Sequence, residues 1–143
     1  MTDHSVRPAA VAGLFYPGDA ATLRAQIAGL FGAANTAARD AAPKILLAPH
    51  AGYVYSGAVA AAAYATLGTA ARERIRRVVL LGPSHRVALR GLAAPTVEAF
   101  ETPLGRIAID RAALDELSDL PQVVARDDAH ASEHALEVQL PFL

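Results

Sequence analysis

Two histidines, His50 and His85, occupy equivalent places in the sequence. His50 follows the apolar run 44–48, and His85 follows the apolar run 76–81; each has a proline one or two residues before it, which stiffens its loop. One such histidine alone is more often an ordinary loop residue, but two at equivalent positions favour a site. Imidazole nitrogens bind transition metals at about 2.0–2.1 Å. We therefore predict that His50 and His85 are ligands of one divalent metal.

The elements around these histidines predict how they are positioned. The runs 44–48 and 76–81 are continuously apolar, which is typical of strands buried on both faces. Between them, the alanine-rich stretch 57–67 predicts a helix that is capped by Ser56 and ended by Gly68. Strand, helix and strand at this spacing form a right-handed unit with parallel strands. Both histidine loops then leave the carboxyl edge of one sheet, where α/β folds bind ligands.

The rest of the chain predicts shorter elements that complete an α/β fold. They are a helix after an N-cap at Asp19, a β-hairpin over 92–100 and 106–109 with its turn at 102–105, a short helix after Asp110, a short strand at 123–124, and a last helix from Ser132 through Leu140.

A second polar cluster consists of His130, His134 and Glu137. His130 and His134 are four residues apart, and His134 and Glu137 are three apart, so the three side chains could share a helix face. One interpretation is that these residues bind a metal. The other is that His134 and Glu137 form the polar face of an amphipathic helix, whose other face holds Leu136 and Leu140. We interpret His130 as structural, and both interpretations stay open for His134.

Other catalytic motifs are weak or absent. Ser84 precedes His85, but this stretch is not a Gly-x-Ser-x-Gly elbow, and neighbours in sequence are poorly placed to form a nucleophile–base pair. No glycine-rich stretch followed by Lys-Ser or Lys-Thr indicates a phosphate loop.

Composition limits the class of protein. The formal net charge is −1, so nothing attracts nucleic acid or an acidic membrane surface. There is no Cys, which excludes disulfides and a thiolate site built from this chain alone. No apolar run is long enough to cross a bilayer, and the first residues lack the apolar core of a signal peptide, so we expect a cytoplasmic protein.

The apolar content leaves two interpretations open. Hydrophobic residues make up 53% of the chain, which indicates either tight alanine-rich packing or an apolar surface covered by something else. The run 136–143 ends in Leu-Pro-Phe-Leu. We expect this run to pack against residues absent from the sequence, or against another copy through self-association. Residues 1–143 are therefore expected to be the amino-terminal portion of a longer domain.

Four motifs together resemble the Memo family, whose bacterial and archaeal members are called AmmeMemoRadiSam system protein B. The resemblance runs from about residue 7 to residue 143, and the combination of motifs is highly specific. Members of that family are considerably longer than this chain, in agreement with the expected incompleteness. The motifs are PAAVAGLFYP at 8–17, APHAGYVYSG at 48–57, LGPSH at 81–85 and EHALEVQLPF at 133–142.

The resemblance implies a fold and a metal site. Memo proteins resemble class III extradiol (LigB-type) dioxygenases, which are non-haem iron enzymes, so we expect the amino-terminal part of a layered α/β/α fold with a mixed, partly parallel sheet. Memo holds its metal with two His and a Cys, and the two His carry over onto His50 and His85. The third ligand is expected beyond Leu143. Imidazole suits Fe(II) and Cu, with Zn also compatible. Candidate pocket residues are His134, Glu137, Tyr53 and Ser84.

The resemblance also implies a function, with an alternative. It implies a metal-dependent redox protein, an oxidoreductase related to the dioxygenases. The alternative is a non-catalytic adaptor that uses the same pocket to recognise a partner. An AMMECR1-like protein and a radical SAM protein are the implied partners. The residues do not decide whether the protein is an enzyme, and they identify no substrate.

Overall fold

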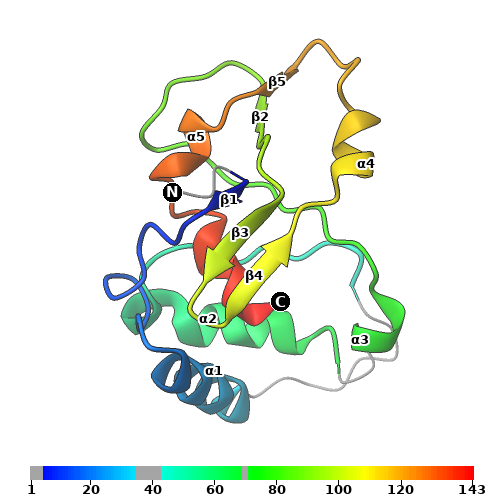
Figure 1. The fold of residues 1–143 in the computed structure, drawn as a ribbon. Coiled ribbons are helices and arrows are strands. Elements are labelled where there is room, and N and C mark those ends of the chain that lie inside the picture. Colours follow the sequence, from blue (N-terminus) through cyan, green and yellow to red (C-terminus); the bar gives the residue numbers. More distant parts are fainter. Residues whose placement is uncertain (1–4, 35–42, 69–70) are drawn as a thin grey trace.

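A helical layer packs beneath a small mixed sheet. The computed structural model describes residues 5–34, 43–68 and 71–143. Helix α1 (Ala20–Ala33) packs on helix α2 (Tyr53–Ala65), and the 3-10 helix η1 (Glu137–Phe142) lies between α2 and the sheet (Figure 1). The fold is therefore α/β, with a mixed, partly parallel sheet as predicted.

The main sheet has the order β1-β3-β4. Strand β1 (Val6–Arg7) is parallel to β3 (Ala99–Thr102), which forms an antiparallel hairpin with β4 (Gly105–Ala108). The predicted turn at 102–105 is confirmed, and Gly105 has φ +132°, a conformation that side chains disfavour.

A separate parallel pair joins β2 (Leu92–Ala94) to β5 (Val123–Ala125). The short strand predicted at 123–124 is thus confirmed. The predicted hairpin strand 92–100 is divided, because its first residues form β2 and only its last residues form β3. Gly91, with φ +90°, lies so close to Gln122 that a Cβ there would come within 2.2 Å of the Gln122 carbonyl oxygen. Its lack of a side chain permits this approach.

Two predicted helix caps are confirmed. The Asp19 carboxylate accepts a hydrogen bond from the Thr22 amide at 2.8 Å at the start of α1. The Asp110 carboxylate accepts one from the Ala113 amide at 3.0 Å at the start of α4 (Arg111–Asp115). Each satisfies an N–H group that has no partner within its helix.

Helix α2 begins earlier than predicted. It starts at Tyr53 after an N-cap at Gly52, and Ser56 lies inside it, where its hydroxyl donates to the Ala51 carbonyl at 2.9 Å. The earlier start places Tyr53 and Tyr64 on the same buried face. Gly68 follows the helix with φ +76°, as predicted for its end.

The runs 44–48 and 76–81 are not strands, so the predicted parallel pair is wrong. Both follow irregular paths, the second after the short helix α3 (Ala71–Arg74), and neither has a ladder partner among the described residues. Ile45 is 87% and Leu47 is 94% exposed, and Val79 and Leu81 are also exposed. The apolar pattern indicates burial on two faces, but a strand also requires a hydrogen-bonding neighbour.

The last helix, predicted over 132–140, forms only in part. Helix α5 (Asp128–Ala131) ends just before the predicted start, and within the predicted range only η1, from Glu137, is helical. Ser132 is therefore the C-cap residue of α5, and its predicted role as an N-cap is wrong. Because the backbone changes direction across 132–136, His130 and His134 do not share a helix face.

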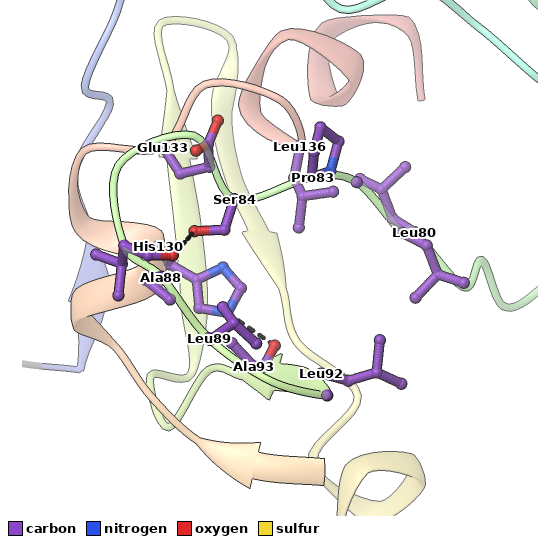
Figure 2. A pocket seen from close by; sticks show the side chains of 15 residues that line it. Leu80, Pro83, Ser84, Ala88, Leu89, Leu92, Ala93, His130, Glu133 and Leu136 are labelled. Carbon is purple, nitrogen blue, oxygen red and sulfur yellow. Dashed lines mark hydrogen bonds between the residues drawn. The ribbon is translucent and has the colours of Figure 1, made fainter. Parts of the chain in front are cut away.

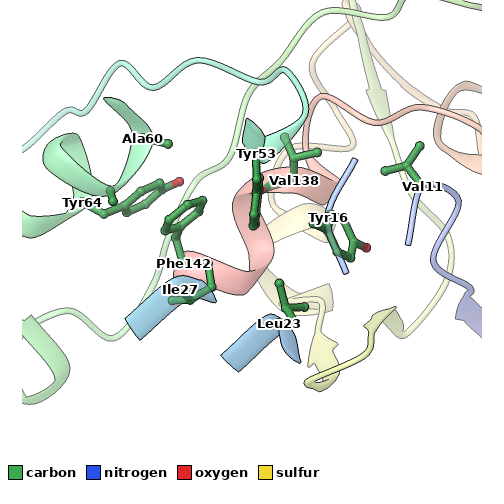
Figure 3. Packing of buried hydrophobic residues seen from close by; sticks show 10 residues of the cluster. Val11, Tyr16, Leu23, Ile27, Tyr53, Ala60, Tyr64, Val138 and Phe142 are labelled. Carbon is green, nitrogen blue, oxygen red and sulfur yellow. The ribbon is translucent and has the colours of Figure 1, made fainter. Parts of the chain in front are cut away.

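The carboxyl-terminal run packs inside the molecule. Val138 and Phe142 of η1 contact Tyr53 and Tyr64 of α2 and the buried side of α1 (Figure 3). The Phe142 ring stacks on Tyr64 with centroids 5.2 Å apart. We expected this run to pack against residues absent from the sequence or against another copy, whereas Val138, Leu140 and Phe142 are buried within this chain. Among the residues that the structure describes, no helix is both long and apolar enough to span a bilayer.

Candidate metal centre

Three histidines from distant parts of the sequence lie together. The rings of His50 and His85 have centroids 5.3 Å apart, so the two side chains lie close together as predicted, although the strands from which that prediction was derived are not formed. His134 stacks on His85 at 4.6 Å and lies 5.9 Å from His50. One ligand nitrogen from each residue lies within 4.8 Å of the other two. The structure thus adds a third histidine to the two that we predicted.

The loop that carries His50 is fixed by the carboxyl-terminal segment. The Gln139 side-chain amide donates to the Pro49 carbonyl at 2.9 Å, one residue before the histidine. Gln139 is itself held, because the Tyr64 hydroxyl donates to its Oε1 at 3.0 Å. On the other side of His50, the Tyr53 amide donates to the Phe15 carbonyl at 2.7 Å. The backbone on both sides of His50 is therefore restrained without a strand.

The loop that carries His85 is fixed by Glu133. The Glu133 carboxylate accepts the backbone N–H of His85 at 2.6 Å and faces His85 Nδ1 at 2.9 Å. It also accepts the amides of His134 and Ala135 at 2.8 and 2.9 Å. Burial opposes ionisation of Glu133, but these hydrogen bonds outweigh it and lower the pKa of the carboxyl to about 2. The carboxylate is charged at neutral pH beside two of the three histidines.

His134 also contacts the His85 loop, and its side chain is 18% exposed. Its ring packs on Phe15 with centroids 4.7 Å apart. Its burial, with smaller contributions from His85, His50 and Arg86, lowers its pKa, against the opposing effect of Glu133. A neutral imidazole has a free lone pair, which is the form that binds a metal.

The donor set fits a transition metal. Three imidazoles suit Fe, Cu and Zn, whereas they are poor ligands for Mg²⁺ and Ca²⁺. Nitrogens that bind one ion at about 2.0–2.1 Å lie no more than about 4.2 Å apart. The ligand nitrogens of the three histidines lie up to 4.8 Å apart, so modest rotation of the side chains would bring them to the distances that one ion requires. Three protein ligands leave coordination positions open for water or substrate.

An open hollow of about 570 Å³ adjoins two of the histidines. Phe15, Tyr55 and Pro49 form an apolar wall beside His50 and His134. We did not predict Phe15 or Tyr55 as site residues, although both lie in the motifs quoted above. Aromatic side chains in such motifs are more often core residues, and nothing in the sequence distinguishes Tyr55, which is exposed, from Tyr53, which is buried.

Two predicted pocket residues, Tyr53 and Glu137, lie in the core instead. The Tyr53 hydroxyl donates to the Val138 carbonyl at 2.7 Å. Glu137 is fully buried and bonded on both oxygens: it pairs with Arg7, accepts from the Tyr16 hydroxyl at 2.5 Å, and accepts the amides of Ala10 and Val11 at 2.8 and 3.0 Å. Burial opposes the charge of Glu137, but these bonds lower the pKa of its carboxyl. The Glu137 side chain joins the amino-terminal segment to η1, and it does not face the histidines.

Ser84 borders a different cavity. Its hydroxyl donates to the Val87 carbonyl at 2.6 Å, which is a local turn contact. The cavity beside it measures about 390 Å³ and is mostly apolar; Figure 2 shows Ser84, Glu133 and Leu136 on its wall. None of the three clustered histidines lines this cavity, so Ser84 is not placed to act on a ligand held by them.

His130 is structural, as interpreted from the sequence. It is buried, and its Nε2 lies 3.0 Å from the Ala93 carbonyl (Figure 2). Its own carbonyl accepts from Arg7 Nε at 2.9 Å. It lies outside the histidine cluster.

Comparisons with known proteins show which family the chain belongs to. The family model described as "Memo-like protein" matches residues 7–143. The chain is 42% identical to a MEMO1 family protein of Ignicoccus hospitalis and 39% identical to one of Aquifex aeolicus, over 96% of this chain and 51% and 49% of those proteins. It is 37% identical to Protein MEMO1 of Xenopus laevis, over 99% of this chain and 47% of that protein. The chain spans about half the length of these relatives. It belongs to the Memo-like family.

Proposed function

We propose that His50, His85 and His134 bind one divalent transition metal. The observation that carries this proposal is that nitrogens from three separate segments lie within 4.8 Å of one another. Two further observations support it: Gln139 and Glu133 restrain the loops of His50 and His85, and an open hollow reaches the cluster. A ligand beyond Leu143, as the resemblance implies, stays a prediction.

We further propose that the metal serves redox chemistry in a cytoplasmic protein related to non-haem iron dioxygenases. When bound, Fe(II) or Cu would supply the ability to exchange electrons, which the three imidazole ligands do not offer. The chain's own residues bind and orient: three imidazoles hold the ion, and Phe15 and Tyr55 give a substrate an apolar surface beside it. The support for the redox class is the family resemblance together with the histidine donor set.

Metal titration tests the first proposal. The chain is dialysed against chelator and titrated with Co²⁺, and binding is followed by calorimetry and visible absorption. We expect one ion per chain, and we expect His50→Ala, His85→Ala and His134→Ala each to lower the affinity at least tenfold. His130→Gln is the matched control, because it changes a histidine outside the cluster. Equal affinity in the wild type and the three variants would overturn the site.

Oxygen consumption tests the redox class. The chain loaded anaerobically with Fe(II) is exposed to O₂ with and without catechol as a probe, and oxygen uptake is recorded. We expect uptake above that of free Fe(II), and we expect it to be lost in His85→Ala. A tightly bound metal without any uptake above that of free Fe(II) would retain the site and reject the redox role.

Partner recognition is a second candidate function, favoured by the exposed apolar residues Ile45, Leu47, Val79 and Leu81. The proposed partners are an AMMECR1-like protein and a radical SAM protein. Sedimentation of this chain with each purified partner tests the candidate. Binding that is lost in Leu47→Asp but kept in His85→Ala would support an adaptor. Failure of both partners to bind would reject it.

A further inference from the structure

Glu133 occupies a place between two of the proposed ligands. Its Oε1 faces His85 Nδ1 at 2.9 Å and lies 3.3 Å from His134 Nδ1. The Glu133 side chain is 5% exposed, whereas that of His85 is 41% exposed. A buried carboxylate therefore contacts the exposed imidazole from the protein side.

The remaining contacts of Glu133 fix its own orientation. Oε2 accepts the backbone N–H of His85, and Oε1 accepts the amides of His134 and Ala135. Gly82, which precedes the His85 loop, packs so closely on this segment that a Cβ there would come within 2.8 Å of Leu136 Cδ2. The carboxylate is thus held by backbone donors on both sides and does not depend on the imidazole for its position.

An ionised carboxylate only accepts hydrogen bonds, so the Nδ1 atom that faces it must carry the proton. In a neutral imidazole the other nitrogen, Nε2, then has the free lone pair. A carboxylate behind a metal-binding histidine has two general effects: it selects the tautomer and increases the basicity of the ligand nitrogen.

We propose that Glu133 is a positioning residue of the metal centre, which holds His85 as the Nδ1–H tautomer and thereby presents Nε2 to the metal. This inference rests on the proposed function, because it assigns a role to Glu133 only in a metal site. His134 Nδ1 lies farther from the same oxygen, at 3.3 Å, so the proposal is confined to His85.

The tautomer is measured first, on the metal-free wild-type chain. Two-bond ¹H–¹⁵N correlation spectra at pH 8, where an ordinary imidazole is neutral, distinguish a protonated Nδ1 from a protonated Nε2. The His85 signals are assigned as those missing from the His85→Gln variant. We expect Nδ1–H for His85. Finding Nε2–H would overturn the proposal without any change to Glu133 and without any metal.

Substitution of Glu133 is the second measurement. Loss of such a partner typically costs 10–100-fold in metal affinity. We expect Glu133→Ala to lower Co²⁺ affinity within that range and to shift His85 toward Nε2–H. Glu133→Gln keeps an acceptor oxygen but not the charge, and we expect about a tenfold loss. The matched control is Glu116→Gln, which changes an exposed carboxylate at the end of α4 and should leave affinity and tautomer unchanged.

The two proposals fail in different ways. If the wild type binds no Co²⁺, the metal site is rejected, and the positioning role is rejected with it even where the tautomer is as expected. If the wild type binds Co²⁺ but a folded Glu133→Ala binds it equally well, the site stands and the role of Glu133 is rejected. Where Glu133→Ala does not fold, unchanged affinity in a folded Glu133→Gln gives the same rejection. Thermal unfolding of each variant separates a loss of affinity from a loss of fold.

Discussion

Two regions of the molecule meet at the histidine cluster, and they are held in opposite ways. The segment 133–142 is buried, and its polar side chains Glu133, Glu137 and Gln139 all have hydrogen-bond partners. The segments 44–48 and 76–81 expose apolar side chains and have no ladder partner among the described residues. The segment 133–142 is therefore packed as a core. The segments 44–48 and 76–81 have the apolar sequence of a core, but several of their side chains are exposed to solvent.

The difference shows what positions the candidate site. His50 and His85 follow the two exposed segments, yet they are restrained through contacts with the buried one. We predicted that sheet strands would place the histidines. In the structure, side-chain hydrogen bonds from Gln139 and Glu133 restrain their loops. The predictions below test how strongly the two regions differ.

The largest expected effect is at Glu137. Replacing it with Ala leaves the Arg7 guanidinium buried without its charged partner. Breaking a buried pair in this way typically costs about 3–5 kcal/mol. We expect Glu137→Ala to lower the free energy of unfolding by that amount in guanidinium titrations. Glu116→Ala, an exposed carboxylate, is the control, and a Glu137→Ala loss no larger than the control's would contradict the assigned core role.

A pair of leucines makes the comparison direct. Leu23 is fully buried in α1, whereas Leu47 is almost fully exposed. Leu23→Ala should reduce unfolding free energy by about 2–5 kcal/mol through lost burial and a cavity. Leu47→Ala should change it by about 0.5 kcal/mol or less. A large loss from Leu47→Ala in the monomer would show that the exposed segment is packed in solution.

Acid should weaken the buried region through Glu137. Because the pKa of Glu137 is lowered in the folded protein, its charged form stabilises the fold above the ordinary pKa of an unfolded glutamate, about 4.3. That stabilisation is lost as pH falls below this value. We expect the unfolding free energy to decrease from pH 6 to pH 3, and to decrease less in Glu137→Gln. Parallel pH profiles for the two proteins would show that Glu137 does not contribute.

The smallest expected effect is at Tyr53. Tyr53→Phe keeps the ring packed on Phe142 but removes the hydroxyl that donates to the Val138 carbonyl. A net loss of about 0.5–1.5 kcal/mol is expected, as is typical for one hydrogen bond. Tyr55→Phe, which removes a hydroxyl from an exposed side chain, should be neutral in the same denaturant titration. If Tyr53→Phe and Tyr55→Phe changed the free energy of unfolding equally, the Tyr53 hydrogen bond would not contribute to the stability of the buried region.

Some local signals predicted local structure correctly, although the helix caps predicted at Ser56 and Ser132 were wrong. Asp19 and Asp110 were identified as caps, and the turn at 102–105 was placed, because each depends on a few adjacent residues. The closeness of His50 and His85 was also predicted, although the strands invoked for it are not formed. The loops of His50 and His85 converge because both contact the segment 133–139. Nothing in the sequences of the two loops indicates these contacts.

Contacts between distant residues could not be predicted. His134 was left undecided because a continuous helix was assumed, and the break across 132–136 changes where its side chain lies. Glu133 carried no signal of its own, since a single glutamate beside a histidine is common and its partner is 48 residues away. Glu137 was assigned to a pocket from its polarity and its spacing from His134, whereas its partners lie more than 120 residues away in sequence.

The Glu137 contacts also have a consequence for synthesis on the ribosome. Arg7, Ala10, Val11 and Tyr16 are translated well before the carboxylate that joins them, which is separated from them by 121 to 130 residues. These contacts cannot form until residue 137 has left the exit tunnel. Closure over so long a loop has a larger entropic cost than local contacts, so these contacts should form after the elements that depend on near neighbours.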